Sequence, residues 1–391
     1  MEQKLTTDKA ENRRALAVFS IASFLNDFGS DMIYPVWPLF VTLLAPTSIA
    51  LAVLGLIDGI GDAIVSISQA VSGYASDRIG KRKIFIWTGY LCGSTSRLGY
   101  AFSSFWAQLI PFKILDRAGK MRGAPRDAIV ADASTRENRG RNFGLLRAVD
   151  NLGAVCGIIT CILLFGFVGY QNLFLLASIP SLVGALLIII FIKDRKTERL
   201  FHGIAFKDLT SNLKLLLFIS AIFALGTFSY SFLLIYAEDF GFQATFIPIL
   251  YLIFTATAAV ASLPFGKLAD IIGRKTILVL SYLFWGILCF GFIINQSYLG
   301  MIFLFVIYGL HKGAMEPVQR AFVSELCPEN LRASFLGAFQ MVVGLCALPA
   351  SLIAGVFWTS FGKYAPFYFS FALTLAAVGL MGFLKEENKE K

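Results

Sequence analysis

Long apolar runs recur along the chain and are separated by short charged segments. Residues 173–192 and 215–237, for example, carry no charged side chain over about the 20 residues that a bilayer-spanning helix needs. The ten-residue alternation of membrane barrel strands is absent. The pattern therefore predicts an all-α polytopic membrane protein with twelve transmembrane helices, near residues 15–44, 49–76, 84–103, 106–132, 142–165, 172–192, 215–237, 245–267, 276–295, 298–326, 334–357 and 364–384.

Composition strengthens this prediction. Of the 391 residues, 57% are hydrophobic and 15% are charged, whereas soluble proteins have about 45–50% and about 25%. Sites for enzyme chemistry are sparse: the two histidines, His202 and His311, lie far apart, and the six cysteines lack metal-ligand spacing. We expect no metal, no cofactor and no enzymatic activity. His311 is expected to be a hydrogen-bonded buried residue more than a coupling group.

The net charge of +9 could indicate nucleic acid, so the distribution of the basic residues decides. With the N-terminus inside, the predicted cytoplasmic segments hold 24 of the 34 Lys and Arg, the external loops hold only Lys363, and the helices hold the rest. This is the positive-inside bias. It predicts no nucleic-acid partner and a multi-pass protein of the cell (inner) membrane with both termini in the cytoplasm. The first apolar run is too long for a cleaved signal peptide, and we expect a monomer.

An internal repeat divides the chain. A shift of 193 residues superimposes "GYASDRIGKRK" (residues 73–83) on "GKLADIIGRK" (residues 266–275) and continues without a gap over about seventy residues. We call these stretches the first and second copies of the repeated loop. The predicted organisation is a cytoplasmic tail (1–14), a six-helix bundle (15–192), a cytoplasmic linker (193–214), a second six-helix bundle (215–384) and a tail (385–391). Two repeats in the same orientation are a transporter architecture.

The repeated loop, and an acid followed seven residues later by Arg after the fourth and tenth helices, resemble the major facilitator superfamily over essentially the whole chain. "FLNDFGSDMIYPVWPLF" in the first helix and "DRAGKMRGAPRDAIVAD" in the fourth are similar to one prokaryotic branch of that superfamily. The resemblance implies two six-helix bundles related by a pseudo-twofold axis. It also implies a secondary transporter, with drug-like or metal-chelate (siderophore-type) solutes among the possible cargoes.

A nucleotide-binding role for the repeated loop fails on spacing. A P-loop needs G-x-x-x-x-G-K-[ST], whereas Gly73 and Gly80 are further apart and Arg82 follows Lys81. Gly80 would allow a positive φ in a tight reversal. The resemblance implies that both copies, together with the acid–Arg pairs, gate the cytoplasmic side, although surface charge pairs remain an alternative. The predicted gating residues are Asp77, Arg78, Gly80, Arg82, Asp132, Arg139, Asp270, Gly273, Glu325 and Arg332.

Charges inside the membrane separate the two halves. A charge at mid-bilayer costs about 2.5–3.5 kcal/mol, so these residues should face a cavity or one another. Asp27 and Asp31, and likewise Asp58 and Asp62, are spaced i,i+4 and should share a helix face. Neighbouring carboxylates repel each other, which raises the proton affinity of one of them and suits proton coupling.

The fourth and fifth helices add Asp116, Arg117, Lys120, Arg147 and Asp150, which could bind an anionic cargo, neutralise the acids of the first helix or form buried structural pairs. At the 193-residue shift, none of these nine predicted substrate- or proton-coupling residues has a charged counterpart. The leading hypothesis is a secondary transporter that moves a small organic solute by alternating access, with H⁺ as the expected coupling ion. The alternative is a transport-inactive membrane receptor or sensor. "NLGAVCGII" in the fifth helix (residues 151–159) has glycines at the spacing of a close helix contact, and it leaves uptake and export equally open.

Overall fold

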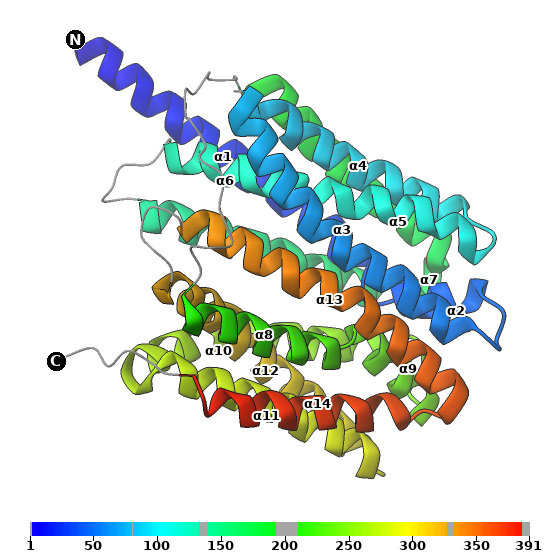
Figure 1. Cartoon of the computed structure of the whole chain (residues 1–391). Helices are drawn as coiled ribbons and strands as arrows, with labels where there is room; N and C mark the ends of the chain where they lie inside the picture. The colour runs from blue at the N-terminus through cyan, green and yellow to red at the C-terminus, as the bar shows by residue number, and fades with distance from the viewer. Residues whose placement is uncertain (1, 80, 133–138, 193–209, 327–331, 385–391) are drawn as a thin grey trace. The chain divides into compact units, whose positions relative to one another are not determined.

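The computed structural model describes residues 2–79, 81–132, 139–192, 210–326 and 332–384, and these ranges are helical without a strand (Figure 1). The elements are α1 (Glu2–Ile33), α2 (Trp37–Leu44), α3 (Ala50–Ile79), α4 (Arg82–Phe102), η1 (Trp106–Gln108), α5 (Leu109–Ala118), η2 (Gly119–Arg122), α6 (Gly123–Asp132), α7 (Arg139–Phe191), α8 (Ser211–Gly226), α9 (Tyr230–Phe240), α10 (Ile247–Ile272), α11 (Arg274–Ile294), α12 (Tyr298–Leu326), α13 (Arg332–Phe361) and α14 (Ala365–Met381).

These elements form twelve spans within the described ranges, so the predicted fold class is confirmed. Three spans are interrupted helices: α1 with α2, α5 with α6 through the 3₁₀ turn η2, and α8 with α9. The long helix α7 contains two spans joined at Gly169, whose φ of 70° breaks the helix. By length and apolar composition alone, seven described helices could cross a membrane, with the two spans of α7 counted as one.

The interruptions have local causes. Helix α1 ends at Ile33 because Pro35 follows, and proline disfavours helical geometry in the residue before it. After the gap that follows α8, Ser229 caps the N-terminus of α9, because its hydroxyl accepts a hydrogen bond from the Ser231 amide. At its other end, α1 begins at Glu2, well before the apolar run, because charged residues also support a helix.

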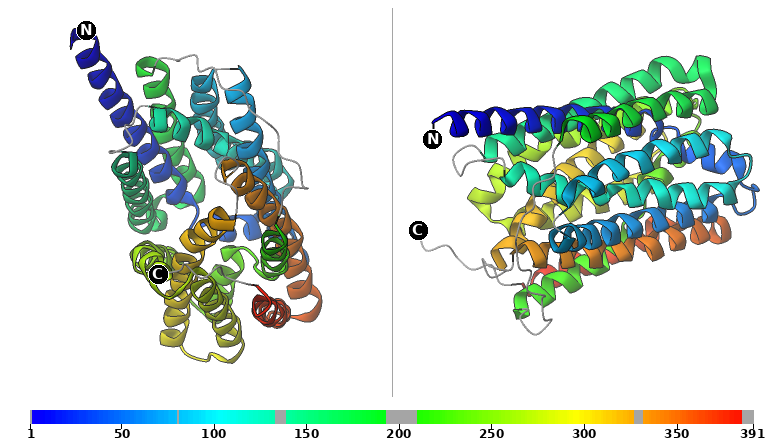
Figure 2. Two further views of the ribbon diagram at one scale, coloured as in Figure 1. Left: turned by 60° about the vertical axis from the view of Figure 1, so that its left-hand side comes forward. Right: turned by 90° about the horizontal axis from the view of Figure 1, so that it is seen from above.

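The contacts within the chain define two compact units, one of residues 1–40 and 64–202 and one of residues 41–63 and 203–391. In the first unit, α7 packs along both α1 and α4. Figures 1 and 2 show the long helices of this unit running beside one another. The predicted glycine contact is confirmed: a Cβ on Gly153 would lie 2.5 Å from the Phe24 carbonyl oxygen, and one on Gly157 would lie 2.2 Å from that of Phe28. These glycines let α1 and α7 approach closely.

In the second unit, α12 packs against α10 and α11, while α14 packs against α11 and α8. Its core is rich in aromatic side chains. Phe228, for example, contacts the rings of Trp285 and Phe367 and is only 4% exposed. Gly309 and Gly313 lie against α10, where added Cβ atoms would meet the carbonyl oxygens of Phe254 and Ala258. Close packing thus replaces charge in this half, because these glycines stand at the positions that Asp116 and Lys120 occupy in the first.

The second copy of the repeated loop shows how the reversal is built. Gly273 separates α10 from α11 with a φ of 98°, a conformation that favours glycine. Arg274 donates to the carbonyl oxygen of Ala321 at 2.8 Å, and Lys275 donates to that of Leu384 at 2.7 Å. Leu384 lies beyond the end of α14, where carbonyl groups have no helical partner, whereas Ala321 lies within α12, so Arg274 ties the start of α11 to the side of α12.

Candidate coupling site

Two sets of polar side chains lie along adjacent faces of α1. Asn26 and Ser30 are buried, whereas Asp27, Asp31 and Tyr34 are half-buried. The spacing of three and four residues places the members of each set on one side of the helix. The predicted shared face of Asp27 and Asp31 therefore also carries Tyr34, and the neighbouring face points into the interior of the first unit.

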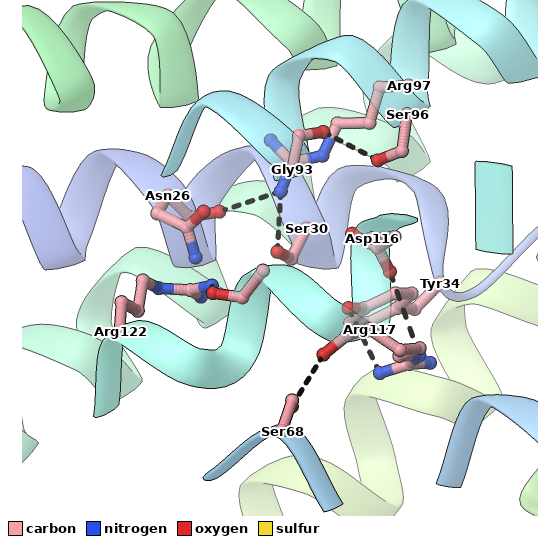
Figure 3. Close-up of polar contacts among 11 residues, drawn as sticks. Asn26, Ser30, Tyr34, Ser68, Gly93, Ser96, Arg97, Asp116, Arg117 and Arg122 are labelled. Atoms are coloured by element: carbon pink, nitrogen blue, oxygen red, sulfur yellow. Dashed lines mark hydrogen bonds and ion pairs between the residues drawn. The ribbon is translucent and has the colours of Figure 1, made fainter. Parts of the chain in front are cut away.

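Arg97 of α4 joins three helices of the first unit, and Figure 3 shows it beside Asn26 and Ser30 of α1. Its guanidinium is almost fully buried and donates to the carbonyl oxygens of Ala177 and Asn26, at 2.8 and 3.3 Å. It also donates to the hydroxyls of Ser30 and Ser181. A buried guanidinium needs several acceptors, and here they come from α1 and α7. Arg97 thus fixes how α1 is rotated against its neighbours.

The span built from α5, η2 and α6 supplies most of the cations. Arg117 pairs with Asp116 at 3.6 Å and lies over the ring of Tyr34, 5.0 Å from the ring centre. Figure 3 shows this group beside Ser68, whose hydroxyl donates to the Arg117 carbonyl oxygen. Lys120 lies in η2 and is close enough to Asp27 for their charges to interact. The structure thus places Lys120 within electrostatic range of Asp27. It places Arg117 against Tyr34, which lies next to Asp31 on the same face of α1.

Asp150 of α7 lies in a buried ion pair. The Arg126 guanidinium is 3.5 Å from the Asp150 carboxylate, 3.0 Å from that of Asp127, and also donates to the Ser23 hydroxyl. Arg126 and Asp150 are each 6% exposed. This geometry favours the structural alternative for Asp150, because a buried pair joining α6 and α7 fixes the contact between them.

The two acids of α3 lie in different surroundings. Asp58 is 5% exposed, and its carboxylate accepts hydrogen bonds from the Ser229 hydroxyl, at 2.8 Å, and from the Ser231 hydroxyl. Both serines belong to the start of α9, in the same unit as this part of α3. Asp62 is exposed, and its charge acts on Tyr308 and Lys312 of α12. The i,i+4 spacing of Asp58 and Asp62 therefore does not give the two carboxylates the same surroundings.

His311 of α12 lies in the aromatic core of the second unit. Its Nδ1 donates to the Ser281 carbonyl oxygen at 2.8 Å, and the Ser281 hydroxyl donates to the His311 carbonyl oxygen at 3.1 Å. The rings of Phe223, Trp285 and Tyr308 surround it. His311 therefore resembles the hydrogen-bonded buried histidine that its apolar setting predicts.

Several predicted residues lie outside the part that the structure describes, in backbone or in side chain. They are Arg147 and, among the gating residues, Asp77, Arg78, Gly80, Asp132, Arg139, Asp270, Glu325 and Arg332. Of the described gating residues, Gly273 makes the reversal before α11, and Arg82 is buried at the start of α4. The gating role of the set stays a prediction.

The most connected residue of the site was not among the predicted ones. Arg97 is visible in the sequence as a cation within an apolar run, and Phe290 stands at its position in the second half. The comparison of halves that selected Asp27 would have selected Arg97 too. Its partners Ser30 and Ser181 carry no comparable sequence signal, because serine is common in membrane helices.

Twelve helical spans with a charged cluster in one half define a membrane transporter rather than an enzyme. The Major Facilitator Superfamily profile matches residues 19–214 and again residues 215–391, so the chain belongs to this superfamily. It is 37% identical over 368 residues to an uncharacterised transporter of the same superfamily from Methanocaldococcus jannaschii, covering 91% of both chains.

Two further comparisons are with a named efflux pump and with a solved transporter structure. The multi-drug resistance efflux pump PmrA of Streptococcus pneumoniae is 25% identical to this chain, over 90% of this chain and 91% of the pump. Among solved structures, a D-xylose–proton symporter superimposes with a TM-score of 0.79 at 15% identity, covering 97% of this chain and 99% of the symporter. At that identity, the likeness to the symporter supports the fold alone.

Proposed function

We propose that this protein is a proton-coupled secondary transporter that moves a small organic solute by alternating access. The observation that carries the proposal is the cluster of membrane-embedded charges in the first unit, on α1 and on the α5–α6 span. Its central members are Asp27, Asp31, Arg117 and Lys120. The second half has apolar or uncharged residues at the equivalent positions.

The proposed coupling chemistry follows from the balance of charge around α1. When Asp27 is ionised, the nearby Lys120 ammonium is partly neutralised. A proton on Asp27 removes that attraction and so changes the charge that the site presents to a solute. Because a net charge is costly in the membrane interior, the states in which a bound proton or a bound solute balances the charge are favoured for the conformational change.

The proposed cargo is an amphipathic, drug-like or metal-chelate (siderophore-type) solute. The relative named a multi-drug resistance efflux pump supports the drug-like part of this proposal. Charged side chains in the first unit would suit a solute that carries a polar or charged group. Uptake and export stay equally open, and the direction of solute movement in a transport assay decides between them.

We further propose that the protein works as a monomer in the cell (inner) membrane with both termini in the cytoplasm. The concentration of Lys and Arg in alternate loops supports this orientation. Light scattering of the purified protein, corrected for detergent, should give the mass of one chain, 42.9 kDa. A mass of two chains would contradict the monomer.

Reconstituted liposomes test the function. Purified protein should accumulate a labelled solute only when a pH gradient is imposed, and Asp27→Asn and Asp31→Asn should each abolish the response to the gradient. Asp239→Asn is the matched control, because Asp239 is an exposed carboxylate at the end of α9. Gradient-driven transport retained in both variants would contradict the assignment of the acids. Solute binding without transport in the native protein would favour the receptor alternative.

A further inference from the structure

The buried face of α1 carries a run of hydrogen bonds that all point toward one carboxylate. Arg97 donates to the Ser181 hydroxyl, and that hydroxyl donates to the side-chain oxygen of Asn26 at 3.0 Å. The amide nitrogen of Asn26 then donates to the Asp27 carboxylate, also at 3.0 Å. We propose that Arg97, Ser181 and Asn26 form a positioning relay that fixes the Asn26 amide as a hydrogen-bond donor to the Asp27 carboxylate. This inference rests on the proposed function, in which Asp27 is the coupling acid.

In this relay, each hydrogen bond determines which group donates in the next hydrogen bond. A guanidinium can only donate, so Ser181 must accept from Arg97 and is free to donate onward. Asn26 then uses its oxygen to accept from Ser181, which leaves its NH₂ group facing Asp27. Without Arg97 and Ser181, the amide could turn over and present its oxygen to the carboxylate instead.

Burial makes the relay effective. Arg97 and Asn26 are 1% exposed and Ser181 is fully buried, so water cannot easily replace a lost partner. Hydrogen bonds in a low-dielectric interior are stronger than in water and polarise one another along a chain. The Asp27 carboxylate, by contrast, is half-buried and remains within reach of a proton.

Charged and titratable groups on other elements also act on Asp27. They are Tyr90 and Arg97 on α4, Lys120 in η2 and Arg126 on α6. Asp150 of α7 acts indirectly through its ion pair with Arg126, and Asp31 lies one turn along α1. The three cations interact with the carboxylate at long range, whereas Asn26 contacts it through a direct hydrogen bond that can be removed without changing any charge.

The relay belongs to one half of the chain. At the 193-residue shift, Asn26 corresponds to Ile219, Arg97 to Phe290 and Ser181 to Thr374. Two of these three positions are therefore apolar in the second half. A clamp needed only to hold a six-helix bundle together would be equally useful in both halves, so its restriction to the half with Asp27 fits a role in coupling.

Infrared titration of Asp27 tests the relay. The carbonyl band of a protonated carboxyl group appears as the pH falls, and the difference between native protein and Asp27→Asn isolates this residue. Asn26→Ala removes a hydrogen bond to a charged group, worth about 1.5–3 kcal/mol, so the midpoint should move upward by about one to two pH units. Ser181→Ala should produce a smaller shift in the same direction, because the amide remains but loses its orientation.

Ser178→Ala is the matched control. Ser178 is a buried serine one turn before Ser181, and its hydroxyl donates to the Leu175 carbonyl oxygen of its own helix. Thermal stability is measured alongside, so that only folded variants are compared.

Upward shifts in Asn26→Ala and Ser181→Ala, with none in Ser178→Ala, would support the relay. Unchanged midpoints, equal shifts in all three variants, or no Asp27-dependent band in any of them would overturn it. Relay-dependent shifts together with gradient-driven transport in Asp27→Asn would support the relay and reject the proposed coupling role.

Discussion

The contact between α1 and α7 gives a prediction whose size follows from the structure. In Gly157→Ala, the new Cβ would lie 2.2 Å from the carbonyl oxygen of Phe28, whereas packed Cβ atoms stay at least 3.0 Å from their neighbours. That oxygen belongs to a helical backbone and cannot turn aside, so α1 and α7 must separate by about 1 Å. Overpacking of this kind costs about 1–3 kcal/mol.

The apparent Tm of the purified protein in detergent measures this cost. For a domain of 150–250 residues, each kcal/mol shifts Tm by about 2–4 °C, so Gly157→Ala should lower the apparent Tm by several degrees. Gly379→Ala is the matched control, because a Cβ there would have no atom within 4 Å and alanine favours the helix. An equal Tm for both variants would refute the proposed close contact.

Two further predictions concern the buried pair and the orientation. Arg126→Gln should destabilise the protein by about 3–5 kcal/mol, because the buried Asp150 carboxylate loses this cation. Adding Asp150→Asn should recover part of the loss in apparent Tm. A double variant with no recovery would contradict the ion pair. In intact cells, a membrane-impermeant maleimide should label Ser48→Cys, in the loop before α3, more strongly than the parent protein. Lys81→Cys, in the first copy of the repeated loop, should be labelled no more than the parent protein. The reverse pattern would contradict cytoplasmic termini.

Much of the fold could be predicted because the thickness of the bilayer imposes a minimum length on every apolar run. The repeat added the division into halves, and the glycine spacing identified the contact of Gly153 and Gly157 with α1. The gap between α8 and α9 could not be predicted, because residues 227–229 contain no proline and the uncharged run continues through them. Hydropathy also placed the start of the first helix near residue 15, whereas α1 begins with charged turns at Glu2.

The candidate site was only partly predictable, since sequence spacing gives a helix face but not what that face meets. Asp58 and Asp62 share the spacing of Asp27 and Asp31, yet Asp58 accepts hydrogen bonds from Ser229, the N-cap of α9, and from Ser231, while Asp62 is exposed. The charge on Arg97 was visible, but its partners come from α1 and α7, and only the folded structure brings those helices together.

Solute flux in liposomes under an imposed pH gradient shows whether protons drive transport through the acids of α1. We expect gradient-dependent flux in the native protein and in Asp239→Asn. We expect no response to the gradient in Asp27→Asn. Flux that follows the pH gradient equally well in Asp27→Asn and Asp31→Asn would contradict proton coupling through these acids.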